Sequence, residues 1–173
     1  MAYFTSAQLK TYEREERLVR LAESHRVTKA LAGVKVFLSH SHQDVDHVKA
    51  ARQLLEANGA SIYVDWEDGE MPATTSTATA TRLKARIREC GRFVLLASER
   101  SKSSLWVPWE LGYADSEKSV SRIAILPFIA ATTAWAGTEY VGLYPTIQFG
   151  AAAPVVVAAG ATVGTSLSAW LTA

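Results

Sequence analysis

The sequence has few of the groups on which common covalent and metal sites depend. It has a single cysteine, Cys90, which excludes an internal disulfide and a multi-cysteine zinc site and fits a reducing compartment. Residues 1–21 lack the apolar central run of a signal peptide. We therefore expect a cytoplasmic protein in which Cys90 is a buried structural thiol.

An excess of charge of one sign is also missing. The formal net charge is +1, so the chain carries no broad field for nucleic acid or an anionic membrane. No Asp, Glu, Lys or Arg follows Glu139, but residues 153–173 consist mostly of Ala, Gly, Ser and Thr. Because a membrane span needs ~20 strongly apolar residues, we expect a buried strand and a short helix there.

Common catalytic motifs are absent as well. There is no P-loop and no G-x-G-x-x-G to hold phosphates, and no G-x-S-x-G turn for a nucleophilic serine. All histidines lie in the first third of the chain: His25, His40, His42 and His47. A Ser–His–acid hydrolase is therefore a poor interpretation.

The stretch "HSHQDVDH", residues 40–47, resembles the His-x-His-x-Asp-His zinc motif of metallo-β-lactamase-fold hydrolases. Val45 stands where that motif needs a ligand, and no histidine follows His47 to complete such a site. We therefore expect no bound metal. The simpler prediction is that Asp44 caps the following helix through its side chain, with His40 and His42 in a polar loop.

Short apolar segments alternate with amphipathic ones along the chain. The predicted strands are 34–39, 60–65, 92–98, 122–128 and 153–159, and the predicted helices are 6–30, 44–59, 76–90, 103–118 and 165–171. This alternation predicts βαβ units, and near-continuous apolar strands indicate helices on both faces. We predict an α/β fold, a doubly wound three-layer sandwich with a five-stranded, mostly parallel sheet. Residues 33–173 form this domain, and 1–32 form an N-terminal helical extension that packs on it or serves in self-association.

Ligands of such folds bind beyond the carboxyl ends of the strands, which points to 39–43, 65–75 and 98–104. "SSLWVPWELG", residues 103–112, lies at this edge. If Ser103 or Ser104 caps the helix, Pro108 falls harmlessly in its first turn. Trp106 and Glu110 then share one face, where an aromatic ring beside a carboxylate suits a flat cationic ligand. The alternative is that Glu110 only favours the helix N-terminus and the tryptophans pack in the core.

Three segments together resemble the TIR (Toll/interleukin-1 receptor) domain of the bacterial enzymatic kind. "VKVFLSHSHQD" is similar to its first strand and loop, "ASIYVDWEDGEMP" to its second strand and long loop, and "SSLWVPWELGYA" to its Ser-x-x-Trp-x-x-x-Glu-Leu helix start. The likeness covers about residues 33–130 and implies a flavodoxin-like fold. It also implies cleavage of the nicotinamide–ribose bond of NAD+, which is a substrate here and not a cofactor.

The resemblance assigns roles residue by residue. Glu110 matches the catalytic glutamate, and Trp106 matches the aromatic residue one turn earlier. The remaining candidates would line the substrate site: Phe37, Ser39, His40, Ser41, Asp65 and, for the phosphates, Arg82. The chemistry fits, because the pyridinium leaves without a general acid and a fixed carboxylate stabilises the oxocarbenium-like ribose.

The chain further resembles the stand-alone TIR proteins of Thoeris-like antiphage defence. These make a cyclic ADP-ribose-type signal that a separate effector protein reads. In many TIR enzymes the loop matching 66–75 reaches a neighbouring subunit, so we expect TIR–TIR self-assembly. Two alternatives stay open: a non-catalytic TIR–TIR interaction module, and a nucleoside-modifying transferase of the same fold class.

Overall fold

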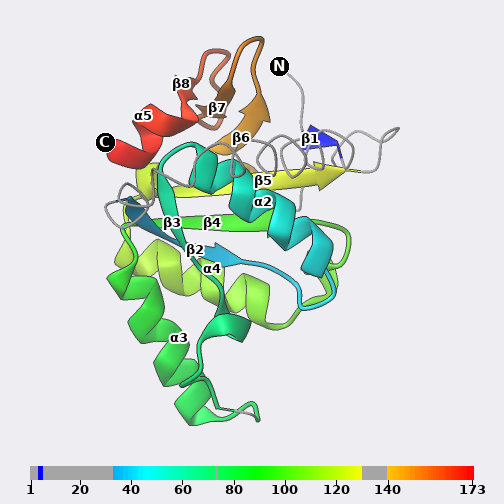
Figure 1. Cartoon of the computed structure of the whole chain (residues 1–173), viewed down its shortest axis with the longest axis vertical. Helices are drawn as coiled ribbons and strands as arrows, with labels where there is room; N and C mark the ends of the chain where they lie inside the picture. The colour runs from blue at the N-terminus through cyan, green and yellow to red at the C-terminus, as the bar shows by residue number, and fades with distance from the viewer. Residues whose placement is uncertain (1–3, 6–32, 73, 130–139) are drawn as a thin grey trace, which may run out of the picture.

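A computed structural model of the chain describes residues 4–5, 33–72, 74–129 and 140–173 (Figure 1). One mixed sheet runs through it in the order β3-β2-β4-β5-β6-β7-β8, with β1 paired to β5 beside this path. Helices cover both faces of the sheet, so the predicted three-layer α/β sandwich is confirmed.

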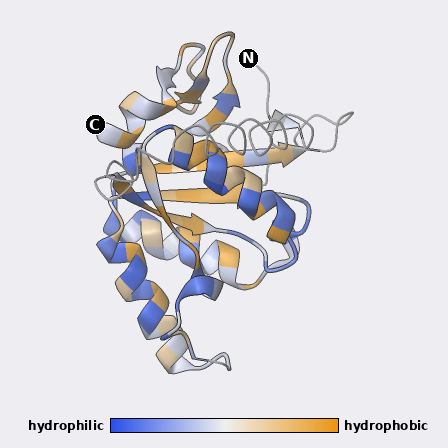
Figure 2. Cartoon of the chain, in the orientation of Figure 1, coloured by the Kyte–Doolittle hydropathy of each residue, from blue (hydrophilic) through white to orange (hydrophobic). Residues whose placement is uncertain are grey.

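The centre of the sheet is parallel, as expected from the alternation of strands and helices. It consists of β2 (Val34–Ser39), β3 (Ala60–Tyr63), β4 (Arg92–Ala97) and β5 (Ile123–Ile129). Figure 2 shows β4 and β5, in the middle of the sheet, as mainly hydrophobic. Since side chains alternate between faces along a strand, Val36 and Leu38 pack on one side and Phe37 on the other.

The helices divide between the two faces. α2 (Val45–Ala57) and α5 (Leu167–Thr172) pack on the face of Val36, while α3 (Thr77–Glu89) and α4 (Trp106–Glu117) pack on the face of Phe37. Local signals set their ends. Gly59, just beyond α2, has φ +98°, a conformation that favours glycine. At the start of α3, Ser76 and Thr79 exchange side-chain and backbone bonds in a capping box.

The predicted number of strands was wrong. β6 (Thr146–Phe149) follows β5 and turns back into β7 (Pro154–Val157), which pairs in turn with β8 (Thr165–Ser166). β1 (Phe4–Thr5) pairs in parallel with the end of β5. Only β7 of these four was expected. The others are two to four residues long, too short for a period-two pattern to stand out.

The uncharged tail forms β7 and α5, a strand and a short helix as predicted. Among the described residues, no helix is both long enough and apolar enough to cross a membrane. The predicted helix 6–30 lies outside the described residues, and its role stays a prediction.

Within the described ranges, four single turns of 3-10 helix connect these elements. They are η2 (Asp65–Glu67), η3 (Ser101–Ser103), η4 (Val120–Arg122) and η5 (Val141–Leu143). η2 and η3 lie at the carboxyl ends of β3 and β4, the edge at which ligands of this fold class bind. The candidate site is therefore built from the ends of β2, β3 and β4 together with the start of α4.

Candidate active site

A buried hydrogen bond joins the end of β2 to α4. Ser39 Oγ donates to Glu110 Oε2 over 2.6 Å, across 71 positions of sequence. The two residues are 1% and 5% exposed. Two residues to which the resemblance gave roles in one site are thus in direct contact.

Burial also changes the charge of this carboxyl group. Removal from water raises the pKa of Glu110 to about 8; the Ser39 hydroxyl opposes this rise and the negative charge of Asp65 adds to it. At neutral pH Glu110 is mostly a protonated acid. Strongly perturbed carboxyl groups of this kind gather at functional sites.

The open cleft edge expected for Glu110 is not what the structure has. Along α4 the residues Val107, Glu110, Leu111 and Ala114 are buried, so Glu110 occupies an inward position of the helix. A small hollow lined by Ser98, Ser101, Val107 and Tyr140, among others, lies at the start of the same helix. Access of a ligand to Glu110 therefore requires movement of the segments that cover it.

Trp106 keeps only part of its surface free. It is half-buried, and its ring meets that of Trp109 edge-on, with centroids 5.1 Å apart. Trp109 in turn stacks on Tyr113 at 6.0 Å, and the Lys84 ammonium of α3 lies over both rings. Ser104 Oγ accepts from the Val107 N–H at 3.3 Å, but Ser104 precedes the N-cap position of α4, which is Leu105 and has no side-chain cap bond.

Phe37 lies in the core beneath this helix. It is 1% exposed, and its ring stacks on Tyr63 at 5.3 Å and on Phe93 at 5.5 Å. It belongs to the same apolar cluster as Trp106 and Leu111. Phe37 therefore packs in the core against the residues of α4 and has almost no surface with which to contact a ligand.

Three further candidates gather where β2 and β3 end. His40 Nε2 lies 3.5 Å from Asp65 Oδ1, and His42 Nε2 lies 3.6 Å from Asp65 Oδ2. Ser41 is buried and its Oγ accepts from the Gln43 N–H at 3.4 Å. His40 and His42 lie in the polar loop after β2, as predicted, but within it the His40 side chain is buried, with only 3% of its surface exposed.

The prediction that Asp44 caps α2 through its side chain was wrong, because its side chain makes no cap hydrogen bond. Its carboxylate instead accepts from Ser98 Oγ at 2.5 Å, across 54 positions of sequence, and lies 3.3 Å from His47 Nδ1. Asp44 and Ser98 thus tie the loop after β2 to the loop after β4. The sequence did not predict this pair because the two residues are 54 positions apart and no local pattern links them.

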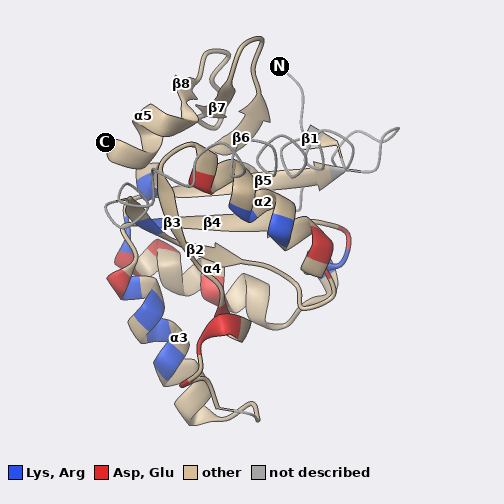
Figure 3. Ribbon diagram, viewed as in Figure 1, with Lys and Arg blue, Asp and Glu red and all other residues tan. Residues whose placement is uncertain are grey.

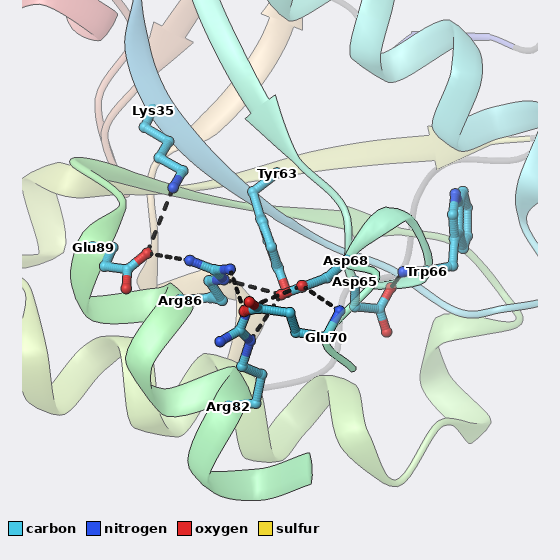
Figure 4. Close-up of polar contacts among 9 residues, drawn as sticks. All are labelled: Lys35, Tyr63, Asp65, Trp66, Asp68, Glu70, Arg82, Arg86 and Glu89. Carbon is cyan, nitrogen blue, oxygen red and sulfur yellow. Dashed lines mark hydrogen bonds and ion pairs between the residues drawn. The ribbon is translucent and has the colours of Figure 1, made fainter. Parts of the chain in front are cut away.

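Arg82, the candidate phosphate ligand, belongs to an ion cluster between α3 and the loop after η2 (Figure 4). Its guanidinium donates twice to Asp68, each at 3.0 Å, and also to Glu70. Arg86 and the Tyr63 hydroxyl donate to the same Asp68 carboxylate at 3.0 and 2.9 Å. Arg82 and Arg86 are partly buried in this cluster, with 25% and 22% of their side chains exposed. Figure 3 shows the basic row on α3 facing the acidic loop.

Asp68 is the centre of this cluster. Its side chain is 5% exposed, and Arg82, followed by Arg86, holds the pKa of its carboxyl group well below its usual range. Hydrogen bonds to a charged group each contribute about 1.5–3 kcal/mol. The cluster fixes the loop that separates β3 from α3.

Replacing Asp68 with Ala is expected to lower the free energy of unfolding by about 2–3 kcal/mol, since three donors lose their shared acceptor. Urea titration at neutral pH measures this. The matched control is Glu99→Ala, which removes an acidic side chain that is 84% exposed and should change stability by less than about 0.5 kcal/mol. Equal stability of both variants would show that the cluster does not hold the loop.

Cys90 fits its predicted structural role. It is 1% exposed, and burial raises the pKa of its thiol to about 11. A thiol that stays protonated at neutral pH is a poor nucleophile.

Comparison with known proteins shows the family to which these site residues belong. A family model described as "TIR domain" matches residues 36–150, which include most of β2, all of β3 to β6 and the site just described. A Bacillus cereus (strain MSX-D12) protein named "Probable 3' cyclic ADP-D-ribose synthase ThsB'" is 40% identical over 119 residues, 66% of this chain and 61% of its own length. A Cytobacillus dafuensis protein, TIR2, named as a proposed cyclic ADP-D-ribose synthase, is 33% identical over 82 residues, 46% of this chain and 22% of its own length. The chain thus spans less than two thirds of either relative.

Proposed function

The chain belongs to the TIR domain family, and from that premise we propose that it cleaves the nicotinamide–ribose bond of NAD+ and closes the ADP-ribose part into a cyclic signal nucleotide. The names of the two relatives support this reaction. The observation that carries it is the buried Glu110 carboxyl group, held by Ser39 at the ligand-binding edge of the sheet.

Glu110 supplies the negative charge that the reaction needs. The nicotinamide ring is already cationic and leaves without protonation, so positive charge develops on the ribose. The carboxylate stabilises that charge, a contribution of about 3–4 kcal/mol, or roughly two to three decades in rate. Ser39 fixes the orientation of the carboxyl group through its 2.6 Å hydrogen bond.

The protonated state of Glu110 in the free protein is part of this proposal. Its pKa of about 8 leaves the carboxyl group mostly neutral at pH 7 as long as no cationic substrate is bound. A pyridinium ring brought next to the group favours the ionised form, because an opposite charge lowers the pKa of an acid. The acid then gives its proton to solvent, and the carboxylate is generated where the cationic substrate binds. Trp106, which is partly buried, offers an aromatic surface on which a base can stack.

The surroundings of the reaction rest on the family resemblance and are proposals. We place the activity in the cytoplasm, in a defence response in which a separate effector protein reads the product. Self-assembly through the loop after η2 would add groups of a neighbouring chain to the site. Because Glu110 is only 5% exposed within one chain, the same contact would have to move the segments that cover it.

The test is to incubate the protein with NAD+ at several protein concentrations and to separate the products by chromatography. The proposal predicts free nicotinamide together with an ADP-ribose product that is cyclic. Linear ADP-ribose in its place would show a hydrolase. No loss of NAD+ at any protein concentration would contradict the reaction itself.

A second candidate is a non-catalytic TIR–TIR interaction module, which an exposed aromatic side chain in the loop after β3 favours. Trp66, in the loop after β3, is 39% exposed and could dock on another TIR domain. This candidate predicts self-association that Glu110→Ala leaves unchanged and Trp66→Ala weakens, with no consumption of NAD+. Sedimentation of these two variants beside the wild type separates the candidates.

A further inference from the structure

Two imidazoles and one carboxylate converge where β2 and β3 end. His40 and His42 come from the loop after β2, and Asp65 begins η2. One ligand atom from each of the three residues lies within 4.8 Å of the other two. The reaction proposed above uses neither imidazole.

His40 presents an unsatisfied nitrogen to this cluster. Its side chain is 3% exposed, and its Nδ1 lies 2.9 Å from the Leu38 carbonyl oxygen. Since a carbonyl oxygen only accepts, Nδ1 carries a proton, and Nε2 of the neutral ring then carries a lone pair. Nε2 is buried and has no hydrogen-bond partner among the residues that the structure describes. Buried polar atoms in this state are rare and point to a missing partner.

The group that Nε2 faces is itself an acceptor. Asp65 Oδ1 lies 3.5 Å away, too far for a hydrogen bond, and His42 Nε2 lies 3.6 Å from Oδ2 of the same carboxylate. Two lone pairs directed at one another repel unless a cation lies between them. Around a tetrahedral zinc ion with bonds of about 2.0–2.1 Å, neighbouring ligand atoms are about 3.4 Å apart. The two separations match that spacing.

The surroundings also hold the ligands in place. The Leu38 carbonyl fixes the tautomer of His40, as an outer partner does in most metal-binding histidines. The backbone N–H of Trp66 donates to Asp65 Oδ1 at 2.9 Å. The Trp66 ring packs edge-on against His40, with centroids 4.2 Å apart, and closes one side of the cluster. Figure 4 shows Trp66 beside Asp65 at the start of the loop.

We propose that His40, His42 and Asp65 bind a divalent transition-metal ion of the zinc class, with a water molecule in the open coordination position. Imidazole and carboxylate ligands in this number suit Zn²⁺ better than Mg²⁺ or Ca²⁺, which prefer oxygen ligands alone. His47 takes no part, because its ring contacts Asp44 and packs on Phe128 at 3.8 Å. The ligands therefore differ from the pattern that "HSHQDVDH" suggested.

The ion would connect two loops of the site. It would tie the loop after β2 to η2 and rest one residue from Ser39, which holds Glu110. Its positive charge would offset the negative charge of Asp65 that acts on Glu110. Metal binding itself does not depend on the proposed reaction and is measured without NAD+.

The experiment uses the full chain without a histidine tag, freed of metal by dialysis against a chelator. Titration with Zn²⁺ against a chromophoric chelator gives stoichiometry and affinity. We expect one ion per chain at sub-micromolar affinity, and Co²⁺ in place of Zn²⁺ should give the visible absorption of a four-coordinate site. His42→Ala should weaken binding by more than about 100-fold, beyond the effect of losing an outer partner.

His47→Ala is the matched control and should change the affinity by less than about threefold, since His47 lies outside the cluster. The His42 side chain is 70% exposed, so its replacement should leave the fold intact, which circular dichroism checks. Absence of a one-to-one complex in the wild type would overturn the proposal. Equal affinity of the His42→Ala and His47→Ala variants would overturn it too. Neither result would bear on NAD+ cleavage.

Discussion

Replacing Glu110 with Gln is expected to slow the release of nicotinamide from NAD+ by about 100- to 1000-fold. The amide keeps the size of the side chain and can still accept the bond from Ser39 Oγ. It cannot carry the negative charge that stabilises the oxocarbenium-like ribose, and the loss of one such preorganised group costs about 3–4 kcal/mol. Chromatography of nicotinamide under single-turnover and steady-state conditions measures the effect.

The matched control is Glu117→Gln on the same helix. Glu117 is exposed and accepts only from the Tyr113 hydroxyl at 2.7 Å among the contacts described. Its turnover should equal that of the wild type. If the Glu110→Gln protein released nicotinamide as fast as the control, Glu110 would have no part in the chemistry.

The same Glu110→Gln substitution is expected to stabilise the fold at alkaline pH. The folded-state pKa of Glu110 is raised from 4.5 to about 8, so between these values the folded protein binds a proton that the unfolded chain has lost. Wild-type stability therefore falls as pH rises through this window, by at most about 1.4 kcal/mol per pH unit from this group. Glutamine removes that dependence.

Urea titrations of both proteins from pH 5 to pH 8 measure the difference. We expect near-equal stability at pH 5, where the wild-type carboxyl group is protonated when folded, and a gap that widens in favour of the variant up to pH 8. Glu99→Gln, at an exposed position, should follow the wild type throughout. A constant gap across the range would mean that Glu110 is not a proton-binding buried acid.

A glutamate that lowers stability and is kept in the core is typical of a functional position. Strained or poorly solvated groups persist where the reaction needs them, at a cost in stability. An interaction module has no such need for a carboxyl group beside Ser39. The two expected results together, lower activity and higher stability in one variant, therefore separate a catalytic group from a packing residue.

The centre of the fold could be predicted because its signals are local. The predicted ranges 34–39, 92–98 and 122–128 correspond closely to β2, β4 and β5, since each is a continuous apolar run. β6 was missed because it has four residues and includes Gln148, which leaves no clear period. β1 and β8 have two residues each and exist only through their partners.

The sequence contains a pattern that indicates the burial of Glu110, but the prediction did not use it. Val107, Glu110, Leu111 and Ala114 stand at the spacing of one helix face, and three of them are apolar. This pattern indicates an inward side chain and not one at an open edge. The expectation of a cleft came from the position of the helix alone.

Contacts across long stretches of sequence could not be predicted in the same way. Asp68 finds Arg82 and Arg86 only because α3 packs beside the loop, and Asp65 meets His42 only because β2 and β3 are neighbours. A single sequence taken by itself gives no signal for such pairs. The family resemblance succeeded where periodicity could not, because it brought Ser39 and Glu110 into one site.

The pH dependence of kcat/KM for nicotinamide release tests the central claim most directly, because this ratio reports the ionisation of the free protein. If the Glu110 carboxylate stabilises the positive charge on the ribose, kcat/KM should rise about tenfold per pH unit below pH 8 and level off near the pKa of about 8. A profile that stays flat from pH 6 to pH 9 would contradict the account.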